Sequence, residues 1–229
     1  NLSAVFGKIL RIQPLGADSR NGRYGIPADN PYAADGNDRT LGEIFASGLR
    51  NPQGLAWDPV NGNMFVTDIG QNIIEELNLV TAGADLGWSN WEGSFRFISR
   101  AAVDLSDRRS EPGITYPIAE YGQLDPLLQP RSAAGGVMVY RDDAIPQLQD
   151  RVLFADFPQG ELFHLPADDL PEGGQDAIRR VLLRDGDDTK RLLQLVAEKT
   201  EEQSREPAVR VDLRFGVGPD GRVFLMNKH

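Results

Sequence analysis

A cation and an amide stand side by side in the segment GLRNPQGLAWDP, where Arg50 and Asn51 precede Pro52 and a run of apolar residues. Proline disfavours a helical conformation in the residue before it, so Asn51 is expected to be extended at the start of a strand. A guanidinium and an amide there can donate several hydrogen bonds to the oxygens of a ligand. The residues leave a second interpretation open, in which Arg50 pairs with a neighbouring carboxylate and Asn51 caps a turn.

Other side chains that could act in catalysis or binding occur singly along the chain. His164 is the only internal histidine, and it either faces a channel from a strand or is a structural histidine. Trp88 and Trp91 either stack on a sugar ring or pack a loop over a sheet, with their indole N–H groups hydrogen-bonded. The acidic runs 35–38 and 185–188 either ligate Ca²⁺ or form turns and a helix cap, because neither has the full spacing of a calcium loop.

The composition excludes several classes of protein. The chain has 229 residues, 34 acidic and 24 basic, with a net charge of −10, so neither nucleic acid nor an anionic membrane surface is an expected partner. The absence of cysteine excludes disulfides and thiolate metal sites. No apolar run approaches the roughly 18–20 residues that cross a membrane, and no phosphate loop, nucleophile elbow or zinc motif occurs.

Short strands are the predicted building elements. Glycine (24) and proline (15) separate short apolar runs throughout the chain. Asn61 and Gly62 predict a hairpin turn between strands at 54–59 and 63–69, and residues 15–40 predict an ordered loop. Further strands are predicted at 7–14, 75–80, 135–141, 151–165, 177–183 and 211–228.

One segment has a helical period instead. Residues 188–205 predict an amphipathic helix that is capped by Asp188 or Thr189 and ended by Pro207. Its apolar face is expected to hold Leu192, Leu193 and Val196.

Three hairpins share one plan of apolar strand, Pro- and Gly-containing turn, and apolar strand with aromatics. They are GLAWDPVNGNMFVTD, RVLFADFPQGELFHL and LRFGVGPDGRVFLMN. This recurrence predicts radial repetition, as in a β-propeller, with a sandwich of similar strands as the competing arrangement. No flexible linker or long charge block divides the chain, so residues 1–229 are expected to form one all-β domain with the helix as an insertion.

The segments GLRNPQGLAWDP and TDIGQNIIEELNLVTAGADLGWSNWEG closely resemble the glucose/sorbosone dehydrogenase family. GKILRI, GIPADNPY, YRDDAIPQLQDRVLFADF and FGVGPDGRVFLMN are also similar to its pattern. The resemblance implies a six-bladed β-propeller, of which this chain is a C-terminal part of three to four blades. The family's catalytic histidine lies upstream of GKILRI, so the N-terminal part of the propeller is an expected partner.

The resemblance implies an activity as well. Family members that use pyrroloquinoline quinone (PQQ) and Ca²⁺ oxidise an aldose or similar polyol, mostly in a periplasmic or secreted setting. Arg50 and Asn51 correspond to residues that bind PQQ, and Arg50 takes the catalytic role of stabilising charge on the reduced cofactor. The backbone carbonyls of Gly70 and Gln71 correspond to ligands of the Ca²⁺.

The sequence departs from the family's pattern in four places. Ile69 stands where PQQ-dependent members have glutamine, and Gln71 replaces a proline. Pro158 stands near the position of a lysine that contacts PQQ in some members. An arginine pair before the last hairpin is reduced to Arg210 and Arg214 with a different spacing. Asp68 is the only carboxylate of the Gly70 loop, and it is either a compensating ligand or a strand-end aspartate in a turn.

These departures leave three functions open. The first is a PQQ-dependent sugar dehydrogenase, or a C-terminal fragment of one. The second is a non-catalytic propeller that has lost the redox site and serves as a binding module. The third is a Ca²⁺-dependent lactone hydrolase, which needs a cluster of channel carboxylates and amides that the sequence does not identify.

Overall fold

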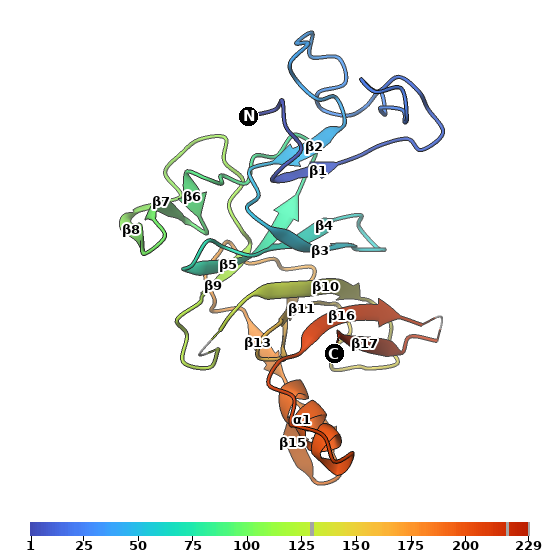
Figure 1. Cartoon of the computed structure of the whole chain (residues 1–229), viewed down its shortest axis with the longest axis vertical. Helices are drawn as coiled ribbons and strands as arrows, with labels where there is room; N and C mark the ends of the chain where they lie inside the picture. Colours follow the sequence, from blue (N-terminus) through green and yellow to red (C-terminus); the bar gives the residue numbers. More distant parts are fainter. Residues whose placement is uncertain (129–130, 219, 229) are drawn as a thin grey trace.

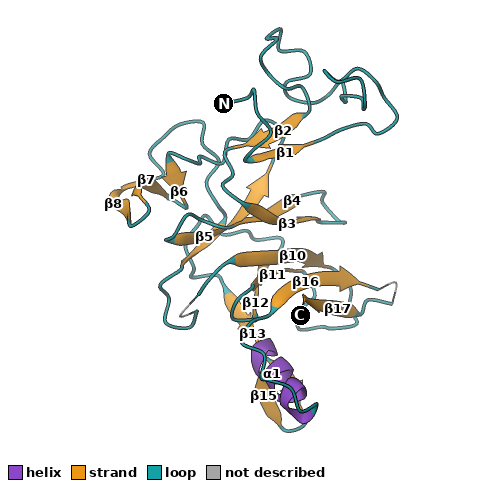
Figure 2. Ribbon diagram, viewed as in Figure 1, coloured by secondary structure: helices purple, strands orange, loops and turns teal. Residues whose placement is uncertain are grey.

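The computed structural model describes residues 1–128, 131–218 and 220–228, and it is built almost wholly of strands (Figures 1 and 2). Most strands belong to four consecutive antiparallel sheets, which we call blades 1 to 4. Blade 1 holds β1 (Lys8–Leu10) and β2 (Ile44–Ser47). Blade 2 holds β3 (Pro52–Trp57), β4 (Met64–Asp68), β5 (Ile74–Val80) and β9 (Ala119–Gly122). Blade 3 holds β10 (Ala134–Tyr140), β11 (Arg151–Asp156), β12 (Glu161–Pro166) and β13 (Arg179–Val181), and blade 4 holds β16 (Asp212–Val217) and β17 (Val223–Lys228).

The first strands of blades 2, 3 and 4 lie against one another. A Cβ atom added to Gly54 of β3 would lie 2.6 Å from the carbonyl oxygen of Gly135 of β10, so glycine permits this close approach. On the other side, a Cβ atom at Gly136 would lie 3.2 Å from the Cα of Arg214 of β16. Sheets that meet along their first strands form a fan, which confirms the predicted all-β propeller and not the sandwich. The described blades do not close into a ring.

The main core lies between the faces of blades 2 and 3. Alternate residues of each strand point to the same face, and here those residues are apolar on both sheets. Tyr121 contributes a ring that lies 5.6 Å from that of Phe163 and 6.4 Å from that of Phe154. The other buried members include Phe65, Leu77, Ile118, Leu128, Val137, Val139, Val152 and Leu165. Burial of these side chains fixes the angle between the two blades.

Two small sheets extend from the blades. The first is the ribbon of β6 (Trp91–Glu92), β7 (Phe95–Ser99) and β8 (Ala102–Arg108), which interrupts blade 2 between β5 and β9. The second is the hairpin of β14 (Leu183–Asp185) and β15 (Asp188–Lys190), followed by α1 (Leu192–Glu202). No helix in the described ranges is long and apolar enough to cross a membrane.

The helix is shorter than the predicted 188–205. Gly186, with φ of 62°, closes a tight turn, so residues 188–190 pair with β14 and cannot serve as a helix cap. The helix begins after Arg191, whose backbone N–H donates to Oε1 of Gln194 at 3.0 Å, and ends before Gln203, well short of Pro207. Its predicted apolar face is confirmed. Leu192, Leu193 and Val196 pack against the core cluster that contains Val211 and Leu213.

Most predicted strands are confirmed with shifted ends. The 54–59 and 63–69 hairpin is β3–β4, with Gly62 at φ of 78° in its turn. The predicted strand 177–183 is divided into β13 and β14, and the predicted strand 7–14 is reduced to β1. In the predicted turn of the last hairpin, Pro219 lies outside the described residues.

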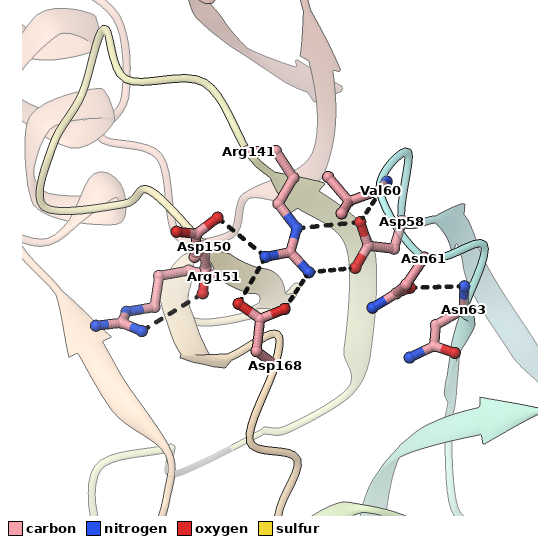
Figure 3. Close-up of polar contacts among 8 residues, drawn as sticks. All are labelled: Asp58, Val60, Asn61, Asn63, Arg141, Asp150, Arg151 and Asp168. Atoms are coloured by element: carbon pink, nitrogen blue, oxygen red, sulfur yellow. Dashed lines mark hydrogen bonds and ion pairs between the residues drawn. The ribbon is translucent and has the colours of Figure 1, made fainter.

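A buried arginine links blades 2 and 3 (Figure 3). Arg141 follows β10, and its guanidinium contacts both carboxylate oxygens of Asp58, in the β3–β4 turn, at 3.0 and 2.5 Å. Asp150 and Asp168 accept further hydrogen bonds at 2.7–2.9 Å from the same guanidinium. Hydrogen bonds to Asp168 and Asp58 raise the pKa of Arg141 above its ordinary value. This cluster holds a turn of one blade against the end of a strand in the next.

Candidate functional site

The segment before β3 is held by one buried carboxylate. The backbone N–H groups of Arg50 and Asn51 donate to the two oxygens of Asp68 at 2.8 and 2.6 Å. Asp68 ends β4 and is 3% exposed, and this burial raises its pKa to about 6 despite the two hydrogen bonds. Asp68 therefore positions the backbone of this segment, in agreement with the interpretation of a strand-end aspartate.

Arg50 is half-buried, and only some of the donor atoms of its guanidinium make hydrogen bonds with described residues. Its Nε donates to Oε1 of Gln71 and its Nη1 to the carbonyl of Ile69, both at 3.3 Å. Among the described residues, no carboxylate lies within ion-pair distance of this guanidinium, although the positive charge of Arg50 acts on Asp68 and opposes the rise of its pKa. No hydrogen bond to a described residue involves Nη2. Thus the alternative in which Arg50 pairs with a carboxylate does not hold for the described residues.

Asn51 is exposed beside Arg50 and retains donor capacity as well. Its Oδ1 accepts a hydrogen bond from Nε2 of Gln53 at 2.9 Å, and no described group accepts from its Nδ2. Arg50 and Asn51 thus present two adjacent donor groups at the start of the first strand of blade 2, where the blades converge. Such donors can bind the oxygens of an anion, because guanidinium and amide groups both donate hydrogen bonds to carboxylate oxygens.

The loop after β4 is tightly built. A Cβ atom at Gly70 would overlap the carbonyl oxygen of Ile74 and lie 2.7 Å from Oε1 of Glu92, so only glycine fits. Glu92 is 1% exposed, and its Oε1 accepts the backbone N–H groups of residues 72, 73 and 74 at 2.9–3.1 Å. Among the described residues, no hydrogen bond is donated to the backbone carbonyl of Gly70 or of Gln71.

Carboxylate clusters do not supply a metal site in the described part of the chain. No group of three or more His, Cys, Asp or Glu residues there is arranged to hold a metal ion. The acidic runs 35–38 and 185–188 form turns, and Asp185 pairs with Lys190 at 2.9 Å.

Blade 3 repeats the arrangement of blade 2. Asp156 ends β11 as Asp68 ends β4, and its Oδ2 accepts the hydroxyl of Ser132 at 2.7 Å and the N–H of Ala133 at 2.8 Å. Burial raises the pKa of Asp156 to about 6, as for Asp68. The spacing Asp-x-x-Gln occurs after both strands, in DIGQ and DFPQ, and this repeat was a readable sequence signal that the sequence analysis missed.

Two further arginines precede the first strands of blades 3 and 4. Arg131 and Arg210 line one cavity of about 300 Å³ together with Pro158, Gln159 and Val209. Arg210 pairs with Asp212 at 2.5 Å, whereas Arg131 has no ion pair with a described residue. The sequence analysis missed Arg131, which lines the same cavity as Pro158.

The remaining candidate residues lie away from the first strands of the blades or make packing contacts. The third strand of blade 3 carries His164, away from the first strands, and burial, followed by Arg151 and Arg179, lowers its pKa. Trp91 is 1% exposed and donates its indole N–H to Glu111 at 2.8 Å, which confirms the packing interpretation. The ring of Trp88 lies edge-on to that of Phe97 at 5.0 Å. The guanidinium of Arg214 stacks on Phe157 at 4.1 Å.

Known proteins support the same fold. The chain is similar to the HIPL2 protein of Arabidopsis thaliana, with 31% identity over 169 residues, covering 68% of this chain and 23% of that protein. The soluble aldose sugar dehydrogenase of Escherichia coli, in its apo-form, matches with a TM-score of 0.63 and 19% identity over 100% of this chain and 53% of its own. The PQQ-bound aldose sugar dehydrogenase of Streptomyces coelicolor matches with a TM-score of 0.53 and 20% identity over 79% of this chain and 40% of its own.

The chain spans only part of the proteins that it matches. It spans 23–36% of the length of the first three curated proteins that it matches. A family model described as glucose/sorbosone dehydrogenase nevertheless matches residues 1–227, almost the whole chain. Together with the fan of blades, this match shows that the chain belongs to the glucose/sorbosone dehydrogenase family.

Proposed function

We propose that this chain forms the cofactor-binding side of a PQQ-dependent dehydrogenase that oxidises an aldose or a related polyol. The observation that carries the proposal is the pair of donors, Nη2 of Arg50 and Nδ2 of Asn51, that bond to no described residue and whose backbone is fixed by the buried Asp68. The PQQ-bound relative from Streptomyces coelicolor supports the cofactor class. Because this chain spans only part of its relatives, the activity is that of a propeller to which it contributes some of the blades.

The residues present fit a carboxylate-rich quinone on this side of the site. PQQ, when bound, supplies the acceptor for the hydride of the sugar. Arg50 would donate through Nη2 to the oxygens of PQQ and favour the negative charge that its reduced form carries. Asn51 would orient the ring system through Nδ2. Asp68 acts as a positioning residue, since it holds the backbone of both donors.

Ca²⁺ is proposed at the Gly70 loop. The carbonyls of Gly70 and Gln71 would hold it, because hard cations prefer oxygen ligands and these two oxygens have no described hydrogen-bond donor. Glu92 limits the movement of the loop by accepting three consecutive N–H groups. Ile69 contributes a carbonyl to Arg50 and no polar side chain.

The proton acceptor is proposed to come from another part of the propeller. Besides His229, which lies outside the described residues, the chain has only His164, which sits on the third strand of its blade. The N-terminal part of a family propeller is therefore the expected source of the base. A periplasmic or secreted setting is proposed on the family resemblance alone.

A binding module without redox activity is the second candidate. It is favoured by Ile69 and Pro158, each an apolar residue at a position where the family pattern has a polar one. Pro158 is buried beside Gln159. A substitution elsewhere in that loop would therefore not easily place a long, positively charged side chain at the position of Pro158. If the chain is such a binding module, it should show no saturable binding of PQQ.

Titration of the chain with PQQ in the presence of Ca²⁺ distinguishes the candidates. Loss of one charge-assisted hydrogen bond costs roughly 1.5–3 kcal/mol, so Arg50→Gln should weaken PQQ binding roughly 10- to 100-fold. Arg23→Gln is the matched control, because Arg23 is exposed and makes no described side-chain contact. Saturable binding that Arg50→Gln weakens and Arg23→Gln does not would support the cofactor role. Absence of binding, or equal loss in both variants, would refute it.

A further inference from the structure

A cavity of about 160 Å³ lies between the outer strands of blades 2 and 3. Tyr121 lines it from β9, the fourth strand of blade 2, and Phe163 and Arg180 line it from β12 and β13, the third and fourth strands of blade 3. The segment of Arg50 and Asn51 precedes a first strand, so this cavity is a separate site. All of its lining residues lie between positions 121 and 180, and the cavity therefore depends neither on the ends of the chain nor on cofactor binding.

Two turns close the sides of the cavity. The backbone N–H of Leu128 donates to the carbonyl of Asp125 at 2.9 Å, and that of Ile178 donates to the carbonyl of Gln175 at 3.0 Å. In each turn the last residue is apolar and packs with the core between blades 2 and 3, whereas the first residue is polar. All four residues line the cavity, and Gln175 is exposed, so the cavity has apolar walls and opens to solvent beside Gln175.

The walls and the volume suit one six-membered aromatic ring. Tyr121, Leu128 and Phe163 are only 2–7% exposed, and the ring centroids of Tyr121 and Phe163 are 5.6 Å apart. An apolar protein cavity of about 150 Å³ stays free of water and binds benzene. Aromatic rings also pack favourably against one another in edge-to-face or offset arrangements. A ligand ring can therefore lie against Tyr121 and Phe163.

Arg180 brings a positive charge to this apolar space. It lies opposite Phe163 in the β12–β13 pair, and opposite residues of an antiparallel pair carry their side chains on the same face. Its Nε lies 2.8 Å from a carboxylate oxygen of Glu161, which is 1% exposed and also pairs with Arg191 at 3.2 Å. Two guanidinium groups thus share one carboxylate, which leaves one positive charge unbalanced among these three side chains.

The guanidinium of Arg180 also has a donor to spare. Its Nη2 is buried and makes no hydrogen bond with a described residue. Burial of a donor without an acceptor is unfavourable, and a hydrogen bond between charged groups is stronger than one between neutral groups. Asp125 also lines the cavity, but its Oδ1 accepts the N–H of Leu127 at 2.9 Å. A ligand that carries a carboxylate would therefore be favoured over a neutral or a cationic one.

We propose that this cavity binds a small aromatic carboxylate, with its ring against Tyr121 and Phe163 and its carboxylate hydrogen-bonded to Arg180. An apolar pocket with a single charged group that fixes the orientation of the ligand is the usual form of a small-molecule site. Benzoate is the simplest compound of this class.

Titration of the 229-residue chain with 4-fluorobenzoate, followed by fluorine NMR, tests the proposal. We expect saturable binding at one site. The uncharged 4-fluorobenzamide has a similar shape and should bind roughly tenfold more weakly, because it makes no charge-assisted hydrogen bond with both partners ionised. The cationic 4-fluorobenzylamine should show no saturable binding. Absence of saturable binding of 4-fluorobenzoate, or equal affinity for the three compounds, would overturn the proposal.

Two variants test the residues that form the site. Arg180→Met keeps much of the side-chain volume but removes the charge, and it should weaken the binding of 4-fluorobenzoate roughly 10- to 100-fold. Ile178→Trp fills the cavity and should abolish binding while Arg180 remains. Arg184→Met is the matched control, since Arg184 is exposed on β14 and does not line the cavity. With circular dichroism showing folded protein, unchanged affinity in Arg180→Met or Ile178→Trp, or an equal loss in Arg184→Met, would overturn the proposal.

Chemical-shift changes of the backbone amides locate the bound ligand on the unaltered chain. The signals of Tyr121, Phe163 and Arg180 should shift during the titration, and changes centred on Arg50 and Asn51 instead would overturn the proposal. The three-compound comparison and this map need no variant, so they decide the proposal even where a variant fails to fold. Neither experiment contains PQQ, so their outcome is independent of the proposed cofactor site.

Discussion

Replacement of Arg141 should destabilise the contact between blades 2 and 3. The side chain of Arg141 is 10% exposed, and that of its partner Asp58 is fully buried. Figure 3 shows the contacts between them. Arg141→Met keeps most of the aliphatic volume but leaves Asp58 with backbone donors such as the N–H of Val60, at 2.9 Å. Removal of one partner from a buried ion pair costs about 3–5 kcal/mol. We expect a loss of about 3 kcal/mol at neutral pH, at the lower end of this range, because the exposed Asp150 and Asp168 let water reach the cluster.

The loss of stability in Arg141→Met should depend on pH, because Asp58 titrates differently with and without Arg141. Burial acts to raise the pKa of Asp58, but the hydrogen bonds from Arg141 and from backbone N–H groups outweigh it, and the net pKa is lowered. In the wild type, Asp58 therefore contributes stability above its unfolded pKa, and this contribution is lost as the pH falls. In Arg141→Met, the hydrogen bonds and the attraction from Arg141 are removed, so the pKa of Asp58 should lie higher than in the wild type, and the stability difference between the two proteins should shrink on acidification.

Urea unfolding followed by circular dichroism measures both effects. The double variant Asp58→Asn with Arg141→Met should recover part of the loss, because it removes the uncompensated charge. Asp168→Asn is the control and should leave the unfolding midpoint close to that of the wild type, since the side chain of Asp168 is 65% exposed. A loss below about 1 kcal/mol in Arg141→Met, or no recovery in the double variant, would contradict the assignment of a buried clamp.

Three further variants test other parts of the structure. Burial raises the pKa of Glu75 to about 8. The stability that its neutral form contributes is therefore lost as the pH rises from about 4.5 to 8. Glu75→Gln should flatten the pH dependence of the free energy of unfolding in that window. A Cβ atom at position 70 would overlap the carbonyl of Ile74, so Gly70→Ala should lower stability by about 1–3 kcal/mol and weaken any Ca²⁺ binding. Thermal unfolding measures the first effect, and calorimetric titration measures the second. Arg131→Gln should weaken PQQ binding roughly two- to fivefold in low salt and less in high salt, because Arg131 is exposed. Unchanged pH dependence, stability or affinity, respectively, would count against each assignment.

The sequence predicted the elements whose signals are local. Turn residues and alternating apolar residues identified the hairpin around Gly62, and glycine in the turn has the expected positive φ. The helix was found from its period, but its start was misplaced, because Asp188 pairs in a hairpin instead of capping. The ribbon β6–β8 was missed, since β6 has only two residues, and β7 and β8 are largely exposed and carry little apolar alternation.

The candidate site was predictable only in part. The resemblance identified Arg50 and Asn51, and the structure shows how Asp68 holds them, as a strand-end aspartate can. The role of Glu92 depends on a contact with residues 18 to 20 positions away, which no local pattern reveals. Arg131 was missed because its partner in the cavity, Arg210, comes from the next blade along the chain.

A crystal structure of the chain grown with PQQ and Ca²⁺ tests the central claim most directly. Our account predicts a PQQ carboxylate or quinone oxygen within hydrogen-bond distance of Nη2 of Arg50, with Asn51 beside it and a cation on the carbonyls of Gly70 and Gln71. A well-ordered PQQ bound away from the segment that precedes β3, or Arg50 turned to the outer rim of the blades, would contradict it.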